Sequence, residues 1–228
     1  MLRAESYGDK SVSNKKCVLI VGMPMSGGSL IGKILLQLGY SASGTDKDPS
    51  KDWNLMSVNH VMCDLPQKPK MNLSSARYAV DHIEAYIKNK IEGNTPWIMH
   101  DPLLCMTFCE FIPFLEKHGI TYKVIIPTRH PHHSALDMLR EDKSKKLEEV
   151  SALLGRYIIA RSMNTERFFV MGIESGKSNE PNMIHVSIND VIDKTEETID
   201  ALISQLELEV TPEQKKAAGL LVSLGTHV

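Results

Sequence analysis

The sequence predicts one α/β domain in which a mostly parallel central sheet carries helices on both faces. Two observations lead to this fold class. Short apolar runs alternate along the chain with longer stretches whose apolar residues recur at helical spacing. The chain has 228 residues, 42% of them hydrophobic and 24% charged, which suits a single domain with a substantial core. Strands that alternate with helices pair in parallel, because each helix returns the chain to the same end of the sheet.

Residues 17–40 predict a strand, a tight loop and a helix in that order. Val18–Val21 is a short apolar run with β-branched residues, residues 22–28 are rich in glycine, and residues 30–38 place apolar side chains at helical spacing before Gly39. Such a loop presents successive backbone N–H groups to one point, and the helix adds the positive end of its dipole. The unit therefore predicts a phosphate or sulfate site. The alternative is that the glycines only allow the helix to pack closely.

The loop matches a phosphate-binding spacing with one exception. Gly22, Gly27 and Ser29 fit the pattern G-x-x-x-x-G-K-[ST], but Gly28 stands where that pattern has lysine. The lysine reaches the terminal phosphates of ATP or GTP in proteins that hydrolyse them. Its absence argues against an ATP or GTP hydrolase.

The remaining chain continues the alternation of strands and helices. In chain order we first expect a loop at 41–54, a short helix to Cys63, a helix at 75–91, a strand at 96–99, a helix at 103–115, a strand at 122–127 and a helix from Pro131. After these we expect a helical stretch at 140–163 with an interruption near Gly155, a short apolar run at 168–171, a loop at 172–182, a strand at 183–188, and helices at 190–206 and from Thr211. His100 and Arg129 each follow a strand directly. Because parallel strands end at one edge of the sheet, both lie at the same edge as the glycine loop.

Composition excludes several classes of function. The net charge is −2 and no long basic run occurs, so neither nucleic acid nor an anionic membrane is an expected partner. Residues 1–16 are polar and predict a flexible leader before a domain at 17–228, and no run of 18 apolar residues predicts a membrane span. The four cysteines lack C-x-x-C or zinc spacing, which favours free thiols in the cytoplasm. Three histidines at 130, 132 and 133 point in different directions from a helix start, and no metal is expected there.

Three stretches resemble the sulfotransferases that use 3′-phosphoadenosine 5′-phosphosulfate (PAPS), in particular their compact bacterial-type members. Residues 22–31 (GMPMSGGSLI) resemble the family's 5′-phosphosulfate loop, and residues 129–138 (RHPHHSALDM) resemble its 3′-phosphate segment. Residues 97–103 (WIMHDPL) resemble a segment that lies between these two in the family. The order and spacing agree over about residues 17–210. The resemblance implies a single P-loop domain of the sulfotransferase type.

The same resemblance implies that the chain transfers a sulfuryl group from PAPS to a hydroxyl or amine of a small molecule. His100 would be the base that takes the acceptor's proton, and a purely structural histidine stays open as the alternative. Arg129 and Ser134 would bind the 3′-phosphate of PAPS or of its product PAP (3′-phosphoadenosine 5′-phosphate). The acceptor is expected between the 41–73 region and the helices after Arg140, and a homodimer is compatible with this interpretation. The residues expected to hold the 5′-phosphosulfate are Gly22, Pro24, Met25, Ser26, Gly27, Gly28 and Ser29.

The chain departs from the family pattern at several of these positions. Met25 replaces a basic residue, Gly28 a threonine, His100 a lysine, Leu103 an arginine and Asp137 a serine. Nearly every change removes a cation or a hydrogen-bond donor from a site for a highly anionic nucleotide. A non-catalytic nucleotide- or anion-binding protein of the same fold therefore stays open as the chief alternative. A P-loop small-molecule kinase is disfavoured by the missing lysine.

Overall fold

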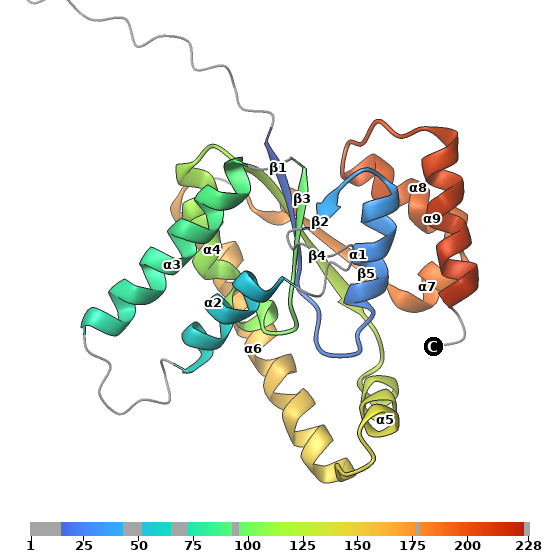
Figure 1. The fold of residues 1–228 in the computed structure, drawn as a ribbon, viewed down its shortest axis with the longest axis horizontal. Coiled ribbons are helices and arrows are strands. Elements are labelled where there is room, and N and C mark those ends of the chain that lie inside the picture. Colours follow the sequence, from blue (N-terminus) through green and yellow to red (C-terminus); the bar gives the residue numbers. More distant parts are fainter. Residues whose placement is uncertain (1–14, 43–51, 65–72, 93–95, 177, 226–228) are drawn as a thin grey trace, which may run out of the picture.

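A five-stranded, entirely parallel sheet forms the centre of the molecule. The computed structural model describes residues 15–42, 52–64, 73–92, 96–176 and 178–225. The strand order is β2-β3-β1-β4-β5, which places the first long strand in the middle (Figure 1). All four pairings are parallel, as the alternation of strands and helices predicts. The strands are β1 (Lys16–Ile20), β2 (Ser41–Ala42), β3 (Trp97–His100), β4 (Thr121–Thr128) and β5 (Met183–Ser187).

Helices cover both faces of this sheet. One face carries α2 (Trp53–Asp64), α3 (Leu73–Glu92), α4 (Leu104–Lys117) and α6 (Leu147–Glu174). The other carries α1 (Gly28–Gln37), α7 (Ile188–Asp193), α8 (Thr195–Gln205) and α9 (Pro212–Gly225). Along β1, Cys17 and Leu19 pack into the first core, whereas Val18 and Ile20 pack into the second. A strand that is buried on both faces in this way reads as a continuous apolar run.

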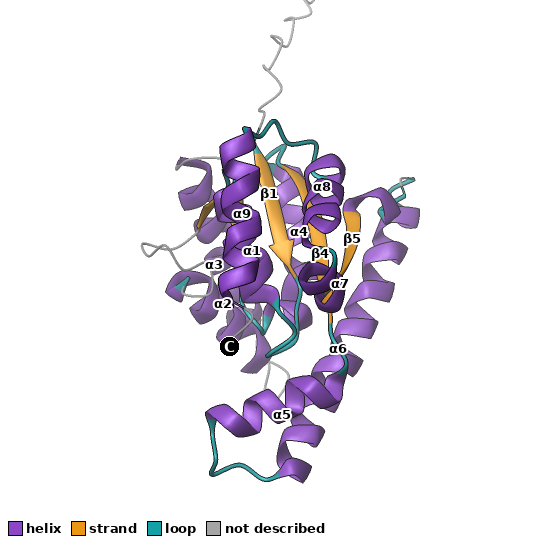
Figure 2. Ribbon diagram, turned by 90° about the vertical axis from the view of Figure 1, so that its right-hand side faces the viewer, coloured by secondary structure: helices purple, strands orange, loops and turns teal. Residues whose placement is uncertain are grey.

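Helix α5 (Pro131–Glu141) and the first part of α6 extend past the edge at which the strands end (Figure 2). They hold a third, smaller apolar cluster of their own. This pair of helices therefore flanks the edge at which the sequence predicts the site.

The long helix α6 differs from the sequence-based expectation. We expected a helical stretch over 140–163 with a break near Gly155, but α5 ends at Glu141 and α6 then runs unbroken through Gly155 to Glu174. A glycine inside a helix costs only about 1 kcal/mol relative to alanine. Packing against α4 outweighs this cost, and Asn164 contributes by donating to the backbone oxygen of Met106 at 3.0 Å. The apolar run at 168–171 and the start of the expected loop at 172–182 also belong to this helix.

The structure differs from the sequence-based expectation at two further places. The single helix expected at 190–206 is two helices, α7 and α8, because the backbone leaves helical geometry at Lys194. Ile192 of α7 is 45% exposed. Ser41–Ala42 lies within the expected loop but forms the two-residue strand β2. The helix expected from Thr211 is confirmed as α9, and the hydroxyl of Thr211 accepts the backbone N–H of Gln214 at 3.2 Å.

Some expectations fall on residues outside the described ranges. The predicted leader at 1–16 is described only at Lys15 and Lys16, and Lys16 already belongs to β1. Most of the loop at 41–54 also lies outside the described residues. All four cysteines are free thiols. None of the helices in the described ranges combines the length and the apolar character that crossing a bilayer needs.

Candidate functional site

The predicted site residues converge at the carboxyl edge of the sheet. β1 ends at Ile20, which pairs with His100 of β3 on one side and with Ile125 of β4 on the other. Residues 22–27, here called the glycine loop, follow β1 and lead into α1. Arg129 follows β4 directly. Three neighbouring strands thus deliver the loop, the histidine and the arginine to one place, which is where open parallel sheets bind their ligands.

The backbone of the glycine loop turns sharply at two residues. Met25 has φ 58° and Gly27 has φ 89°, both in the left-handed region. The N–H of Ser26 donates to the oxygen of Met23 at 3.1 Å, which closes a tight turn, and Gly27 caps α1. The first N–H groups of a helix have no acceptor within it. The N-terminal turn of α1 therefore offers donors and a positive dipole end beside the loop.

Two glycines of the loop are fixed by close neighbours as well as by backbone conformation. A Cβ on Gly22 would lie 2.6 Å from Oγ of Ser26. A Cβ on Gly27 would overlap the side chain of Ile188 at the start of α7. Both side chains would have to move to admit anything larger than hydrogen. The close packing that we gave as the structural alternative is therefore present, together with the backbone geometry of an anion site.

His100 lies against the start of α1. Its side chain is 4% exposed, and a Cβ on Gly28 would overlap Nε2 of the imidazole and lie 3.1 Å from Cδ2. The imidazole thus occupies the space next to the loop where the general phosphate-binding pattern has a lysine side chain. The imidazole of His100 therefore contacts the predicted anion site.

Arg129 and Ser134 both bind the glycine loop itself. The guanidinium NH1 of Arg129 and the hydroxyl of Ser134 each donate to the backbone oxygen of Met25 at 3.1 Å. Met25 itself has a left-handed backbone conformation. Ser134 is fully buried. The two residues predicted to bind the 3′-phosphate therefore also fasten the loop to β4 and α5.

The side chain of Met25 has an apolar role in this structure. It packs against the small cluster between α5 and α6 that contains Ala135, Met138, Val150 and Leu154. A basic residue at this position would place its charge in or beside that cluster. Methionine is well suited to such an irregular contact because it is long, flexible and apolar.

Asp137 is the nearest charged partner of Arg129. Oδ2 of Asp137 lies 2.5 Å from NH1 of Arg129, and Oδ1 lies 2.9 Å from NH1 of Arg140. The side chains of Arg129 and Asp137 are 28% and 21% exposed. The arginine predicted to bind a phosphate is therefore already paired with a carboxylate of the chain.

A buried polar network behind His100 escaped the sequence analysis. Asp101 is 2% exposed, and it accepts the side-chain N–H of Asn59 on α2 at 2.6 Å and the backbone N–H of Leu103 at 3.2 Å. Asn59 in turn accepts the hydroxyl of Thr107 on α4 at 2.6 Å. Burial raises the pKa of the Asp101 carboxyl above its usual range. The network connects α2 and α4 to the end of β3 and so holds His100 in place. The sole sign of it in the sequence is that a polar residue, Asp101, follows the apolar run of β3.

The other predicted residues differ in exposure. Ser29 is exposed on the first turn of α1, Pro24 is half-buried, and Ser26 within the loop has no exposed surface. Lys33, one turn after Ser29, is also exposed. In the part of the chain that the structure describes, no group of three or more histidine, cysteine, aspartate or glutamate side chains is suited to a metal ion.

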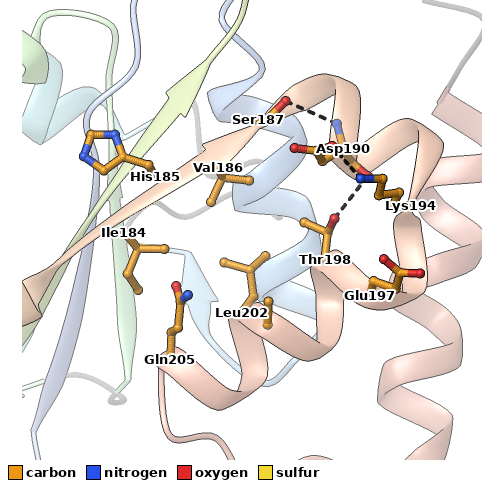
Figure 3. A pocket seen from close by; sticks show the side chains of 11 residues that line it. Ile184, His185, Val186, Ser187, Asp190, Lys194, Glu197, Thr198, Leu202 and Gln205 are labelled. Atoms are coloured by element: carbon orange, nitrogen blue, oxygen red, sulfur yellow. Dashed lines mark hydrogen bonds and ion pairs between the residues drawn. The ribbon is translucent and has the colours of Figure 1, made fainter.

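Two grooves elsewhere on the surface contain none of the predicted site residues. One of about 230 Å³ runs along β5 between Ile184 and Gln205 of α8 (Figure 3). At one end of it Asp190 lies 3.7 Å from the ammonium of Lys194, and its backbone oxygen accepts the hydroxyl of Thr198 at 3.1 Å. A second groove, of about 460 Å³, lies between α8 and α9. The candidate site is therefore defined by the convergence of strand ends.

Comparison with known proteins agrees with this architecture. A scan against models of protein families gave no match. A search of curated proteins likewise gave none. Among solved structures, the sulfotransferase STF9 from Mycobacterium avium superposes with a TM-score of 0.58 at 10% identity, over 93% of this chain and 69% of that one.

Two sulfotransferase domains match less well. The domain from the Synechococcus PCC 7002 olefin synthase has a TM-score of 0.47 and 13% identity, over 87% of this chain and 75% of that domain. The domain from the curacin biosynthetic pathway has a TM-score of 0.49 and 12% identity, over 88% and 76%. The fold predicted from three short sequence stretches is thus confirmed by the match to the mycobacterial enzyme, and we conclude that this chain has the fold of the sulfotransferases.

Proposed function

We propose that this protein transfers a sulfuryl group from PAPS to a hydroxyl or amine of a small molecule. The observation that carries the proposal is the contact between His100 and the start of α1 beside the glycine loop, at the carboxyl edge of a sheet with the sulfotransferase fold. This arrangement puts a base next to an anion cradle, and sulfuryl transfer to a hydroxyl requires both.

The 5′ end of PAPS fits the residues present. The glycine loop turns in left-handed geometry at Met25 and Gly27, which exposes backbone to a ligand, and the first turn of α1 offers backbone donors. The hydroxyl of Ser26 is buried and has no hydrogen-bond partner among the residues that the structure describes, and it lies beside Gly22. PAPS would supply the activated sulfuryl group. The loop would bind and orient its 5′ end and stabilise the charge that develops on the leaving phosphate.

His100 would move the proton in this reaction. As the acceptor oxygen forms its bond to sulfur, the imidazole takes the proton of the hydroxyl, and the bond from sulfur to the phosphate oxygen breaks. Asp101, Asn59 and Thr107 hold the end of β3 in place, so the ring keeps its position against Gly28. A base that is held rigidly in this way is preorganised for proton transfer.

The experiment is incubation of the protein with sulfur-labelled PAPS and a panel of hydroxyl and amine acceptors, with His100→Gln as the inactive control. Transfer of label by the parent and its loss in the variant are expected. Absence of transfer to every acceptor, together with absence of binding to PAP, would contradict the proposal.

A non-catalytic nucleotide- or anion-binding protein is the second candidate, and the ion pair of Arg129 with Asp137 favours it. Binding of PAP without transfer to any acceptor would support it. A small-molecule kinase is less favoured, because His100 fills the space beside Gly28 where a phosphate-binding lysine would reach. We place the protein in the cytoplasm, since its four cysteines are free thiols. That it forms a homodimer stays a prediction.

A further inference from the structure

The 3′ half of the proposed nucleotide site carries a fixed negative charge. Asp137 lies on α5, two turns after Arg129, and both of its carboxylate oxygens are held by guanidinium groups. Arg129 uses the same NH1 group to bind Asp137 and the backbone oxygen of Met25. The cation that would meet a 3′-phosphate is thus engaged by two acceptors of the chain.

Charge determines which ligand this arrangement favours. A phosphate that reached Arg129 would lie beside the carboxylate of Asp137, and like charges at such short separation repel strongly where water is partly excluded. The remaining positive charge of the trio is on Arg140, whose side chain is 77% exposed. Attraction from that exposed group is screened by solvent and salt. The carboxylate of Asp137 therefore weakens the binding of a dianionic group at Arg129.

The same carboxylate suits a different ribose substituent. A carboxylate accepts hydrogen bonds from hydroxyl groups, and in dinucleotide-binding folds an acidic side chain binds the free ribose hydroxyl while an arginine accommodates the phosphorylated one. Asp137 is 21% exposed at the edge where the nucleotide is proposed to lie, and each carboxylate oxygen has a second lone pair beyond the one its arginine uses. It can accept a ribose hydroxyl without releasing Arg129.

We propose that Asp137 sets the nucleotide specificity of the site, so that nucleotides with a free 3′-hydroxyl bind at least as tightly as their 3′-phosphorylated counterparts. This rests on the proposed function, because it requires that the 5′-phosphate binds at the glycine loop. The corresponding sulfuryl donor is adenosine 5′-phosphosulfate, used alongside or in preference to PAPS. Asp137 is in this account a specificity residue for the donor and takes no part in the transfer step.

The test compares AMP with PAP, which differ only in the 3′-phosphate. Calorimetry at fixed salt should show that the parent binds AMP at least as tightly as PAP. Asp137→Ser should strengthen PAP binding by about tenfold or more, since it removes the repulsive charge and frees Arg129, while AMP binding stays equal or weakens. Asp137→Asn, which keeps the size of the side chain, should shift the preference in the same direction.

A control variant accompanies this experiment, and its outcomes distinguish failure of this proposal from failure of the proposed function. Asp142→Ser removes an aspartate just beyond the end of α5 whose carboxylate binds Ser144 and Lys145, and it should leave both affinities unchanged. Thermal unfolding checks that each variant folds. If the parent binds PAP at least tenfold more tightly than AMP, the specificity role of Asp137 is wrong and the proposed function stands. If the parent binds neither nucleotide, both proposals fail.

Discussion

The imidazole of His100 fills the space that any side chain on Gly28 would need. Both positions differ from the pattern that residues 22–31 and 97–103 resemble, which has a lysine in place of His100 and a threonine in place of Gly28. A ring at the end of β3 can pack on the first residue of α1 only if that residue lacks a Cβ. The two departures are therefore one structural feature of the site.

Replacing Gly28 by threonine should disrupt this contact. The new side chain overlaps the ring of His100, and overpacking of a buried site typically lowers the free energy of unfolding by about 1–3 kcal/mol. Urea denaturation measures this change. The control is Gly155→Ala on α6, where a Cβ meets nothing within 4 Å, and which should be neutral or stabilising by up to about 1 kcal/mol.

A double substitution tests the pairing directly. When His100→Ala is already present, Gly28→Ala should cost little, so the two effects are not additive. Additive losses of stability would show that the ring and the glycine do not compete for space.

Replacing His100 should separate chemistry from binding. His100→Ala should lower the rate of sulfuryl transfer by about a hundredfold or more, as loss of a general base does, with PAP affinity nearly unchanged. An unchanged rate in a folded His100→Ala protein would assign the residue a structural role only.

Replacing Gly27 by alanine should lower the free energy of unfolding more than the same replacement at another glycine with positive φ. Gly27→Ala combines a positive φ with overlap on Ile188, whereas Gly119→Ala has φ 65° and open space around its Cβ. Strain of this kind costs about 1–3 kcal/mol at either position. The overlap should add to this at Gly27 and should also weaken the binding of PAP. Equal losses in unfolding free energy for the two variants would mean that Ile188 moves aside freely.

Asp101 should make stability fall as pH rises from mildly acidic values. Burial raises the pKa of Asp101 above its ordinary value of 3.8, so between these two values the folded state holds more protons than the unfolded state. The free energy of unfolding therefore decreases with pH across that window. Asp101→Asn should be less stable overall, because one of its two acceptor contacts is lost. Its free energy of unfolding should, however, no longer decrease with pH across this window. Urea titrations at several pH values check the slope.

Asp142 is the control of opposite sign for this experiment. Hydrogen bonds from Ser144 lower the pKa of the exposed Asp142 carboxyl. The stabilisation associated with this group is present above its ordinary value of 3.8 and is lost as pH falls below it. Asp142→Asn should thus leave the slope above that pH unchanged. A change there would show that the pH dependence does not report on Asp101.

Local patterns were sufficient for much of the fold. The apolar runs of β1 and β4 and the proline at the start of α5 predicted those elements, because they depend on neighbouring residues. The length of α6 could not be predicted in the same way. Gly155 is an unfavourable helix residue by itself, and only packing of α6 against α4, which the sequence does not display, carries the helix through it.

The site shows the same division. The loop glycines, His100 and Arg129 could be placed from their positions after strands. The partners that define their roles are distant in sequence: Ile188 beside Gly27, Asn59 beside Asp101, and the Met25 oxygen beside Arg129 and Ser134. Asp137 was recognised as a departure, but its ion pair with Arg129 depends on where α5 begins and how it turns, which no local pattern specifies.

The central place of β1 has a consequence for biosynthesis. β1 is synthesised before the other strands, yet its two neighbours, β3 and β4, are 97–100 and 121–128 in the chain. More than half of the protein must therefore leave the ribosome before the first strand gains both partners. Until then its run of apolar residues is exposed to other nascent chains, and long-range parallel pairing of this kind is slow. We therefore expect β1, which precedes the glycine loop, to depend on a chaperone during synthesis.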